Sequence, residues 1–291
     1  MAASSELKDN NAFCACESDI MRNAMQSRRV GPDVPHLIPI LDALPAGAIV
    51  LEVGCGPGGI TLDIAQRYPQ LLVLGIDIDK QSIKQANEAA SEAGTKNIRY
   101  SVGDAVELAA SASEPGFEAI KGGCDLVYTH AALMHTGDAL KAVKQCSLAT
   151  KPGGTITMKE GDMGLFFAYP DLPGMTKLFE VFPKLGAAKG ADPRLGRKLI
   201  SHLLAAGHKR DDITVVDMST TILSRPEHRQ GMAKGFDQIF ADVASKPAWM
   251  ESCGITQEDV KLIRDAIPQW ADAEDGIVAF PSIHVVCHKA N

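Results

Sequence analysis

The stretch with the clearest chemical potential is 50–61, which reads VLEVGCGPGGIT. An apolar run precedes its glycines and a helical pattern follows, as in strand–loop–helix units that bind nucleoside cofactors. Glycines let the backbone turn sharply and let a ligand approach atoms that a side chain would cover. Two cofactors fit this loop: Gly54-x-Gly56-x-x-Gly59 has the dinucleotide spacing, whereas Gly54-x-Gly56-x-Gly58 after an acidic residue indicates another nucleoside.

Glu52 is the residue that separates these two interpretations. Its carboxylate would repel a pyrophosphate and attract an ammonium or sulfonium group, because opposite charges within about 4–6 Å favour each other. Asp77 ends the apolar run LLVLGID, where it can accept hydrogen bonds from both hydroxyls of a ribose. Both cofactors contain that ribose, so Asp77 indicates a nucleoside without choosing between them.

Helical patterns alternate with short β-branched runs through the first 160 residues. This alternation predicts an α/β fold with a doubly wound parallel sheet and ligands outside the carboxyl ends of its strands. The expected strands are 48–53, 71–77, 97–104, 125–130 and 155–160. The expected helices are 36–44, 60–68, 80–93, 104–113 and 138–150.

The pattern changes from residue 161 onward, where Pro and Gly interrupt apolar segments. A helix is expected over 194–208, and helices broken at Pro247 and Gly254 are expected over 225–272. Two long β-like runs, 212–223 and 276–290, fit antiparallel edge strands. We therefore expect one catalytic unit. It is a single domain over 1–291. Its N-terminal segment is 1–35, and its cap or substrate-binding insertions are 161–212 and 224–276.

Composition narrows the class of protein. The 291 residues are 45% apolar and carry a formal charge of −7, which leaves no overall positive field to attract nucleic acid. No stretch reaches the ~18 apolar residues of a membrane span, and the first residues lack a signal-peptide core, so we expect a cytoplasmic protein. Seven scattered cysteines favour reduced thiols, and Cys14-x-Cys16 lacks the second pair of a metal site.

These segments together resemble the class I S-adenosylmethionine-dependent methyltransferases, in the group that includes the ubiquinone and menaquinone C-methyltransferases and many small-molecule methyltransferases. The matching segments are HLIPILDALPAGAIVLEVGCGPGGIT, VLGIDID, RYSVGDA, CDLVYTHAALMH and LATKPGGTITMKE. Each is weak alone, but their order and spacing are specific. The resemblance implies a seven-stranded Rossmann-like sheet whose last strands, 213–223 and 277–288, are antiparallel. It also implies S-adenosylmethionine as cofactor and S-adenosylhomocysteine as product.

The resemblance further implies a set of cofactor contacts. The matching positions are Glu52, Gly54, Cys55, Gly56, Gly58, Asp77, Ile78, Asp104, Ala105 and Thr129. The glycine loop would lie against the methionine part, with Glu52 near its amino group. Asp77 would bind the ribose, Ile78 would pack on the adenine, and Asp104 would accept from the adenine amino group. Thr129 would lie near the methyl donor.

Methyl transfer from a sulfonium needs alignment and exclusion of water, and a base only if the acceptor must lose a proton. His130 and His135 follow the fourth strand, where either could deprotonate or hold the acceptor. The alternative is that His130 bonds the cofactor or a carbonyl and that His135 lies on a helix surface. Metal-dependent relatives place carboxylates just after strands four and five. Thr129 and His130 occupy the first of these positions, so we expect no metal.

The acceptor is expected to be a small molecule held by the rim of the sheet and the cap. Glu160 and Asp162 could bind a cationic or hydroxylated acceptor, although solvated loop acids are the plainer interpretation. Phe167, Tyr169 and Trp249 would indicate an apolar or aromatic acceptor if they line the site rather than the core. The alternatives are an NAD(P)-dependent oxidoreductase and a cofactor-binding protein with non-methylating chemistry. A homodimer is left open.

Overall fold

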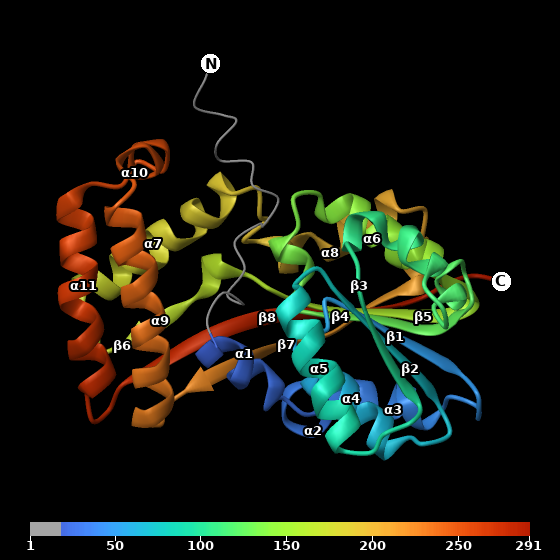
Figure 1. The fold of residues 1–291 in the computed structure, drawn as a ribbon. Coiled ribbons are helices and arrows are strands. Elements are labelled where there is room, and N and C mark those ends of the chain that lie inside the picture. Colours follow the sequence, from blue (N-terminus) through green and yellow to red (C-terminus); the bar gives the residue numbers. More distant parts are fainter. Residues whose placement is uncertain (1–18) are drawn as a thin grey trace.

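The computed structural model describes residues 19–291, so Cys14 and Cys16 lie outside the described residues. An eight-stranded sheet runs in the order β3-β2-β1-β4-β5-β8-β6, with β7 paired to β8 (Figure 1). The strands are β1 Ile49–Val53, β2 Leu72–Asp77, β3 Ile98–Val102, β4 Cys124–His130, β5 Thr150–Gly161, β6 Phe167–Tyr169, β7 Ile213–Leu223 and β8 Ile277–His288. The first five strands are parallel, whereas β8 is antiparallel to β5, β6 and β7.

Helices cover both faces of the parallel part of the sheet (Figure 1). One face is covered by α2 Val30–Asp33, η2 Pro35–Leu37, α3 Ile38–Asp42, α4 Gly59–Arg67 and α5 Lys80–Glu92. The other is covered by η3 Ala105–Ser113, η4 Glu118–Ile120, η5 Leu133–His135, α6 Ala139–Ala149 and α8 Leu199–Ala205. Alternate residues of each strand enter the two cores, as Val50 and Leu51 do in β1.

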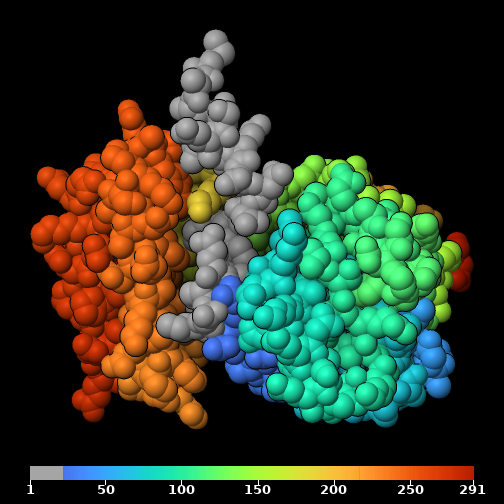
Figure 2. All heavy atoms as spheres, in the orientation of Figure 1, coloured from blue at the N-terminus to red at the C-terminus, as the bar shows by residue number. Residues whose placement is uncertain are grey.

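A separate helical lobe forms the cap at the far end of the sheet. It consists of α7 Pro173–Ala188, α9 Pro226–Ala244, α10 Pro247–Ser252 and α11 Gln257–Asp272. Figure 2 shows α9 to α11, in orange and red, standing beside the blue-to-green lobe of the first strands and helices. The rings of Phe182, Phe236 and Trp270 meet between α7, α9 and α11.

Arg229 of α9 anchors this cap to the sheet. Its guanidinium is fully buried and donates hydrogen bonds to backbone carbonyls where the cap joins the strands. The accepting residues are Ser224, Ala271, Ala273 and Gly276. One side chain therefore joins the segment after β7, the end of α11 and the segment before β8.

The α/β class, the five parallel strands and the antiparallel last strands are confirmed. The strand count was wrong by one, because β6 adds a short pair with the start of β8. The expected helix 36–44 is split into η2 and α3, and Pro39 lies within it. The expected helix 104–113 is a 3₁₀ element kinked at Glu107. Within residues 19–291, no helix is long and apolar enough to cross a membrane.

Two further differences concern the segments around β5 and the cap. The strand expected from residue 155 begins at Thr150. The segment 161–193, expected to be rich in loops, contains the sixteen-residue helix α7. Pro173 lies in the first turn of α7, where a proline is tolerated because the first N–H groups have no helical partner.

Candidate functional site

The glycine loop joins β1 to α4 and has the backbone geometry that only glycine adopts easily. Gly54, Gly56 and Gly58 have φ of +80°, +52° and +78°. A Cβ at Gly54 would lie 2.2 Å from the Cβ of Ala132, and one at Gly58 would lie 2.5 Å from the Tyr100 hydroxyl. The loop therefore needs glycine both for its turn and for its close packing.

Gly59 has a different reason to be glycine. It begins α4 with no positive φ, and a Cβ there would lie 2.5 Å from the carbonyl oxygen of Gln26. Gln26 ends α1, Asp19–Gln26, which packs against the start of α4. Gly59, the third glycine of the dinucleotide spacing, thus lacks a side chain where α1 packs against the start of α4.

Asp77 ends β2 directly beside the glycine loop. Its Oδ2 accepts from the Gly56 N–H at 2.7 Å, and its Oδ1 accepts from the Asp79 N–H at 2.9 Å. Burial raises the pKa of Asp77, while these backbone hydrogen bonds act in the opposite direction. A carboxylate has about four lone-pair sites, so each oxygen retains capacity for a further hydroxyl donor.

Two exposed apolar side chains flank Asp77. Ile78 follows it with 46% of its surface exposed, and Val102, which pairs with Asp77 from β3, is 41% exposed. Large apolar side chains at a strand end suit contact with a flat ring. Val102 was not predicted as a site residue, although it stands near the end of the third expected strand. Asp104 caps η3, because its Oδ1 accepts a hydrogen bond from the Val106 N–H at 2.9 Å. Ala105 is the first residue of η3.

Glu52 lies beneath the glycine loop rather than open to it. Only 3% of its surface is exposed, and its Oε2 accepts a hydrogen bond from the Thr61 hydroxyl of α4. Burial raises the pKa of Glu52 to about 7, so the carboxyl is not firmly ionised at neutral pH. This carboxyl therefore attracts a cationic cofactor less strongly than the fully ionised Glu52 that the sequence predicted.

The end of β4 presents its two polar residues to opposite faces of the sheet. Thr129 pairs with Met158 of β5, and its hydroxyl donates to Glu160 at 2.9 Å. His130 pairs instead with Lys159, on the face that also holds His284. Thr129, expected near the cofactor, and His130, expected to contact the acceptor, thus lie on opposite faces of the sheet.

His130 belongs to a cationic neighbourhood that keeps its ring neutral. Burial lowers the pKa of His130 well below its usual value, and the charges of Arg28 and Lys159 lower it further. Its Nδ1 is buried without a hydrogen-bond partner among residues 19–291. Beside it, the rings of His36 and His284 lie 3.4 Å apart between centroids.

Glu160 does not face an acceptor, contrary to the sequence-based assignment. It has no exposed surface, and its carboxylate accepts from the Thr129 hydroxyl and from the segment after β4. The backbone donors are Ala132, Leu133 and Met134, at 3.4, 3.2 and 3.2 Å. Burial raises the pKa of Glu160 to about 7, against the effect of these bonds. His135 ends η5 in the segment that Glu160 holds.

Asp162 is likewise not a solvated loop acid. It is fully buried and receives two hydrogen bonds from Arg197, which precedes α8, and one from the Gly164 N–H at 3.0 Å. The carboxylates of Glu160 and Asp162 are therefore both buried and hydrogen-bonded within the protein.

The aromatic candidates separate into two groups. Phe167 and Tyr169 lie on the same face of β6 and are 51% and 46% exposed. Trp249 of α10 is only 4% exposed, with the Lys189 ammonium 4.7 Å from its ring centroid. Trp249 therefore packs within the cap, which fits the alternative that it belongs to the core.

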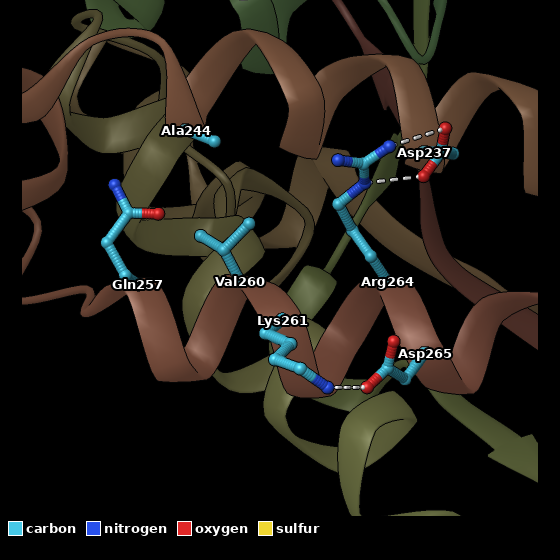
Figure 3. A pocket seen from close by; sticks show the side chains of 7 residues that line it. All are labelled: Asp237, Ala244, Gln257, Val260, Lys261, Arg264 and Asp265. Atoms are coloured by element: carbon cyan, nitrogen blue, oxygen red, sulfur yellow. Dashed lines mark hydrogen bonds and ion pairs between the residues drawn. The ribbon is translucent and has the colours of Figure 1, made fainter.

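Figure 3 shows a pocket on the cap between α9 and α11. Its charged lining is internally paired, Arg264 with Asp237 at 2.7 Å and Lys261 with Asp265 at 2.5 Å. The lining contains none of the polar groups gathered at the ends of β1, β2 and β4.

A family model described as a methyltransferase domain matches residues 44–186. An uncharacterized methyltransferase of Schizosaccharomyces pombe is 26% identical over 195 residues, which cover 65% of this chain and 66% of that protein. A protein of Aspergillus luteorubrus described as a probable methyltransferase is 26% identical over 86% of this chain and 87% of its own. The chain thus spans just under two thirds of the first relative.

The solved structure of the YcgJ protein of Bacillus subtilis shares the fold. Its TM-score is 0.53 at 15% identity, with 88% of this chain and 98% of that chain covered. The residues matched by the family model contain the glycine loop and the strands β1 to β6. Residues 44–186 thus match a methyltransferase domain, and most of the chain is similar in sequence to methyltransferases and in fold to the YcgJ protein.

Proposed function

We propose that the protein transfers a methyl group from S-adenosylmethionine to an oxygen, nitrogen or carbon atom of a small metabolite. The observation that carries this proposal is the Gly56–Asp77 hydrogen bond, which places the glycine loop, a carboxylate and the exposed Ile78 at one edge of the sheet. The cofactor supplies an electrophilic methyl group on a sulfonium. The protein binds and aligns the two reactants and excludes water.

The residues beside Asp77 fit a nucleoside. In the proposal, Asp77 accepts from the ribose hydroxyls and Ile78 packs on the adenine, near Asp104 and Ala105. The loop from Gly54 to Gly58, which includes Cys55, lies against the methionine part. The positive φ of its glycines and the spare lone pairs of Asp77 support this placement.

His130 is proposed to hold the acceptor rather than to act as a strong base. Its lowered pKa keeps the ring neutral, so a ring nitrogen can accept a hydrogen bond from a hydroxyl or amine. A base whose pKa lies far below the working pH gains little from taking the proton. His135 remains the second candidate, because η5 follows the end of β4 directly.

The acceptor is proposed to be apolar or aromatic, and the cap segments 161–212 and 224–276 are proposed to bind it. The exposed faces of Phe167 and Tyr169 on β6 support this assignment. Glu160 and Trp249 are left out of the acceptor site because both are buried.

The proposal also includes a cytoplasmic location and a homodimer. The five cysteines found free among the described residues fit a reducing compartment. Val215, Met218 and Ile222 on β7 are 46%, 59% and 55% exposed, which supports β7 as the surface that meets a second copy. The charge of −7 supports the expectation that nucleic acid is not a partner.

The experiment that tests methyl transfer uses S-adenosylmethionine with an isotopically labelled methyl group and a fractionated small-molecule extract. We expect label in a small organic product, detected by mass spectrometry, and equimolar S-adenosylhomocysteine. Cofactor binding with no labelled product from any fraction would favour non-methylating chemistry instead. Label transferred to added nucleic acid, and to no small-molecule fraction, would contradict the proposed acceptor class.

A further inference from the structure

Glu160 holds the segment that follows β4, residues 131–135, which form the post-β4 loop. The four donors to the Glu160 carboxylate are neutral: the Thr129 hydroxyl and the N–H groups of Ala132, Leu133 and Met134. An ionised carboxylate only accepts hydrogen bonds, so it suits four donors converging on two oxygens.

The post-β4 loop has a backbone conformation that needs such support. Ala131 has φ of +52°, a left-handed conformation that is unfavourable for an L-residue. Its N–H donates to the Lys159 carbonyl at 2.8 Å, which turns the chain back against β5. The Glu160 contacts then fix the three residues that follow.

The same loop packs directly against the glycine loop. The Cβ of Ala132 occupies the space beside Gly54, where an added Cβ would lie only 2.2 Å away. The post-β4 loop also starts after His130 and ends at His135. Its position therefore sets the space between the glycine loop and the two candidate histidines.

We propose that Glu160 is a positioning residue of this site, whose carboxylate holds the post-β4 loop against the glycine loop and so maintains cofactor affinity and alignment. This inference rests on the proposed function. Glu160 touches no reactant in this account and acts through the loop.

The charge state of Glu160 provides a readout that a merely structural residue would lack. Burial raises its pKa to about 7, and a protonated carboxyl would point an O–H at N–H donors. Few other groups near it titrate in this range. Cys146 of α6 keeps its proton because burial raises its pKa to about 12, and Asp162 is paired with Arg197.

The effects of the remaining neighbours on the pH dependence can be distinguished from that of Glu160. Ile283 of β8 and Met218 of β7, in register with Glu160, carry no charge, and Gly196 before α8 meets only its backbone carbonyl. His135 lies in the loop itself, and a His135→Gln variant separates any effect of its imidazole from that of Glu160.

The test compares Glu160→Gln with Glu118→Gln, which makes the same change at an exposed carboxyl. Hydrogen–deuterium exchange of a peptide covering residues 129–136 reports the loop, after correction for the intrinsic pH dependence of exchange. Calorimetric titration with S-adenosylhomocysteine between pH 6 and 8.5 reports the site. We expect about tenfold faster loop exchange and about tenfold weaker binding in Glu160→Gln at pH 8, the size of one lost charge-assisted hydrogen bond. Wild-type and Glu118→Gln binding should weaken below about pH 7, and Glu160→Gln should lose this dependence except for the part that Glu52, whose pKa is also about 7, supplies.

The outcomes distinguish failure of the role of Glu160 from failure of the proposed function. A folded Glu160→Gln with wild-type loop exchange and wild-type affinity would overturn the role of Glu160. If the wild-type protein does not bind S-adenosylhomocysteine, the proposed function fails, while loop exchange still tests Glu160. If Glu160→Gln does not fold, wild-type loop exchange between pH 6 and 8.5 decides, and a pH-independent rate would contradict the proposal. Glu160→Asp, which keeps the charge, should retain the pH dependence.

Discussion

The backbone N–H of Gly56 donates a hydrogen bond of 2.7 Å to Oδ2 of Asp77, which joins the glycine loop to the end of β2. The other oxygen of Asp77 accepts from the Asp79 N–H, at the start of α5. One carboxylate thus shapes the loop and keeps lone pairs that the proposed ribose contact would use. The residue assigned to the nucleoside is also part of the scaffold that forms its site.

Replacement of Asp77 should therefore affect ligand binding in two steps. Asp77→Asn keeps the shape and one acceptor oxygen but turns an N–H₂ group toward a backbone donor. We expect S-adenosylhomocysteine affinity to fall about tenfold, and about a hundredfold for Asp77→Ala, which removes the loop contact as well. Calorimetric titration of both variants measures this. Equal affinity of the wild type and a folded Asp77→Ala would rule out the assignment.

The contact between Gly54 and Ala132 can be tested by a compensating pair. Gly54→Ala combines a left-handed backbone with a Cβ placed 2.2 Å from the Cβ of Ala132. We expect it to lower the free energy of unfolding by about 3 kcal/mol, measured by urea denaturation. The double variant Gly54→Ala/Ala132→Gly removes the clash and should recover about half of this.

Gly94→Ala is the matched control for the backbone alone. Gly94 has φ of +65° and no atom within 4 Å of an added Cβ, so the substitution should cost only about 1 kcal/mol. A double variant no more stable than Gly54→Ala would show that Ala132 is not the limiting contact.

Removal of the Arg229 side chain should loosen the cap. Arg229→Met preserves volume but leaves the carbonyls of Ser224, Ala273 and Gly276 without their donor. We expect a loss of about 3 kcal/mol in the free energy of unfolding. Arg264→Met, which breaks an exposed ion pair with Asp237, should cost less than about 1 kcal/mol. Similar losses for the two variants would contradict the anchoring role.

Glu52 should make stability depend on pH in a defined direction. Burial raises its pKa from 4.5 to about 7, so the folded state holds a proton that the unfolded state releases. This contribution is fully present below pH 4.5 and is lost as the pH rises through 7. Relative to wild type, Glu52→Gln should thus gain about 3 kcal/mol between pH 4.5 and 8. A difference that is constant across this range in chemical denaturation would show that Glu52 ionises normally.

The parallel strands, the glycine loop and the acidic end of β2 could be predicted from sequence because each is a local pattern. Buried strands are continuous apolar runs, and Pro247 and Gly254 interrupt the helical pattern of 225–272 where α9, α10 and α11 separate. Helix α7 was missed because its prolines and glycines resemble a loop. Pro173 lies in the first turn, and Pro183 lies inside the helix.

The roles of the buried polar residues could not be predicted, because they depend on contacts distant in sequence. Glu160 binds amides about 27 residues before it, and nothing in TITMKE distinguishes a carboxyl that faces solvent from one that faces the preceding loop. Trp249 reads as a ligand-binding aromatic, yet its ring is enclosed by the cap. Glu52 had the expected position but its carboxyl accepts a hydrogen bond from Thr61, in the first turn of α4.

The most direct test of the central claim is a calorimetric titration of the wild-type protein with S-adenosylhomocysteine and, separately, with NAD. We predict saturable binding of S-adenosylhomocysteine and none of NAD. At a ligand concentration 100-fold above Kd, binding should also stabilise the fold by ~2.7 kcal/mol in a thermal denaturation experiment. Binding and stabilisation by NAD, with no response to S-adenosylhomocysteine, would contradict the assignment of the glycine loop.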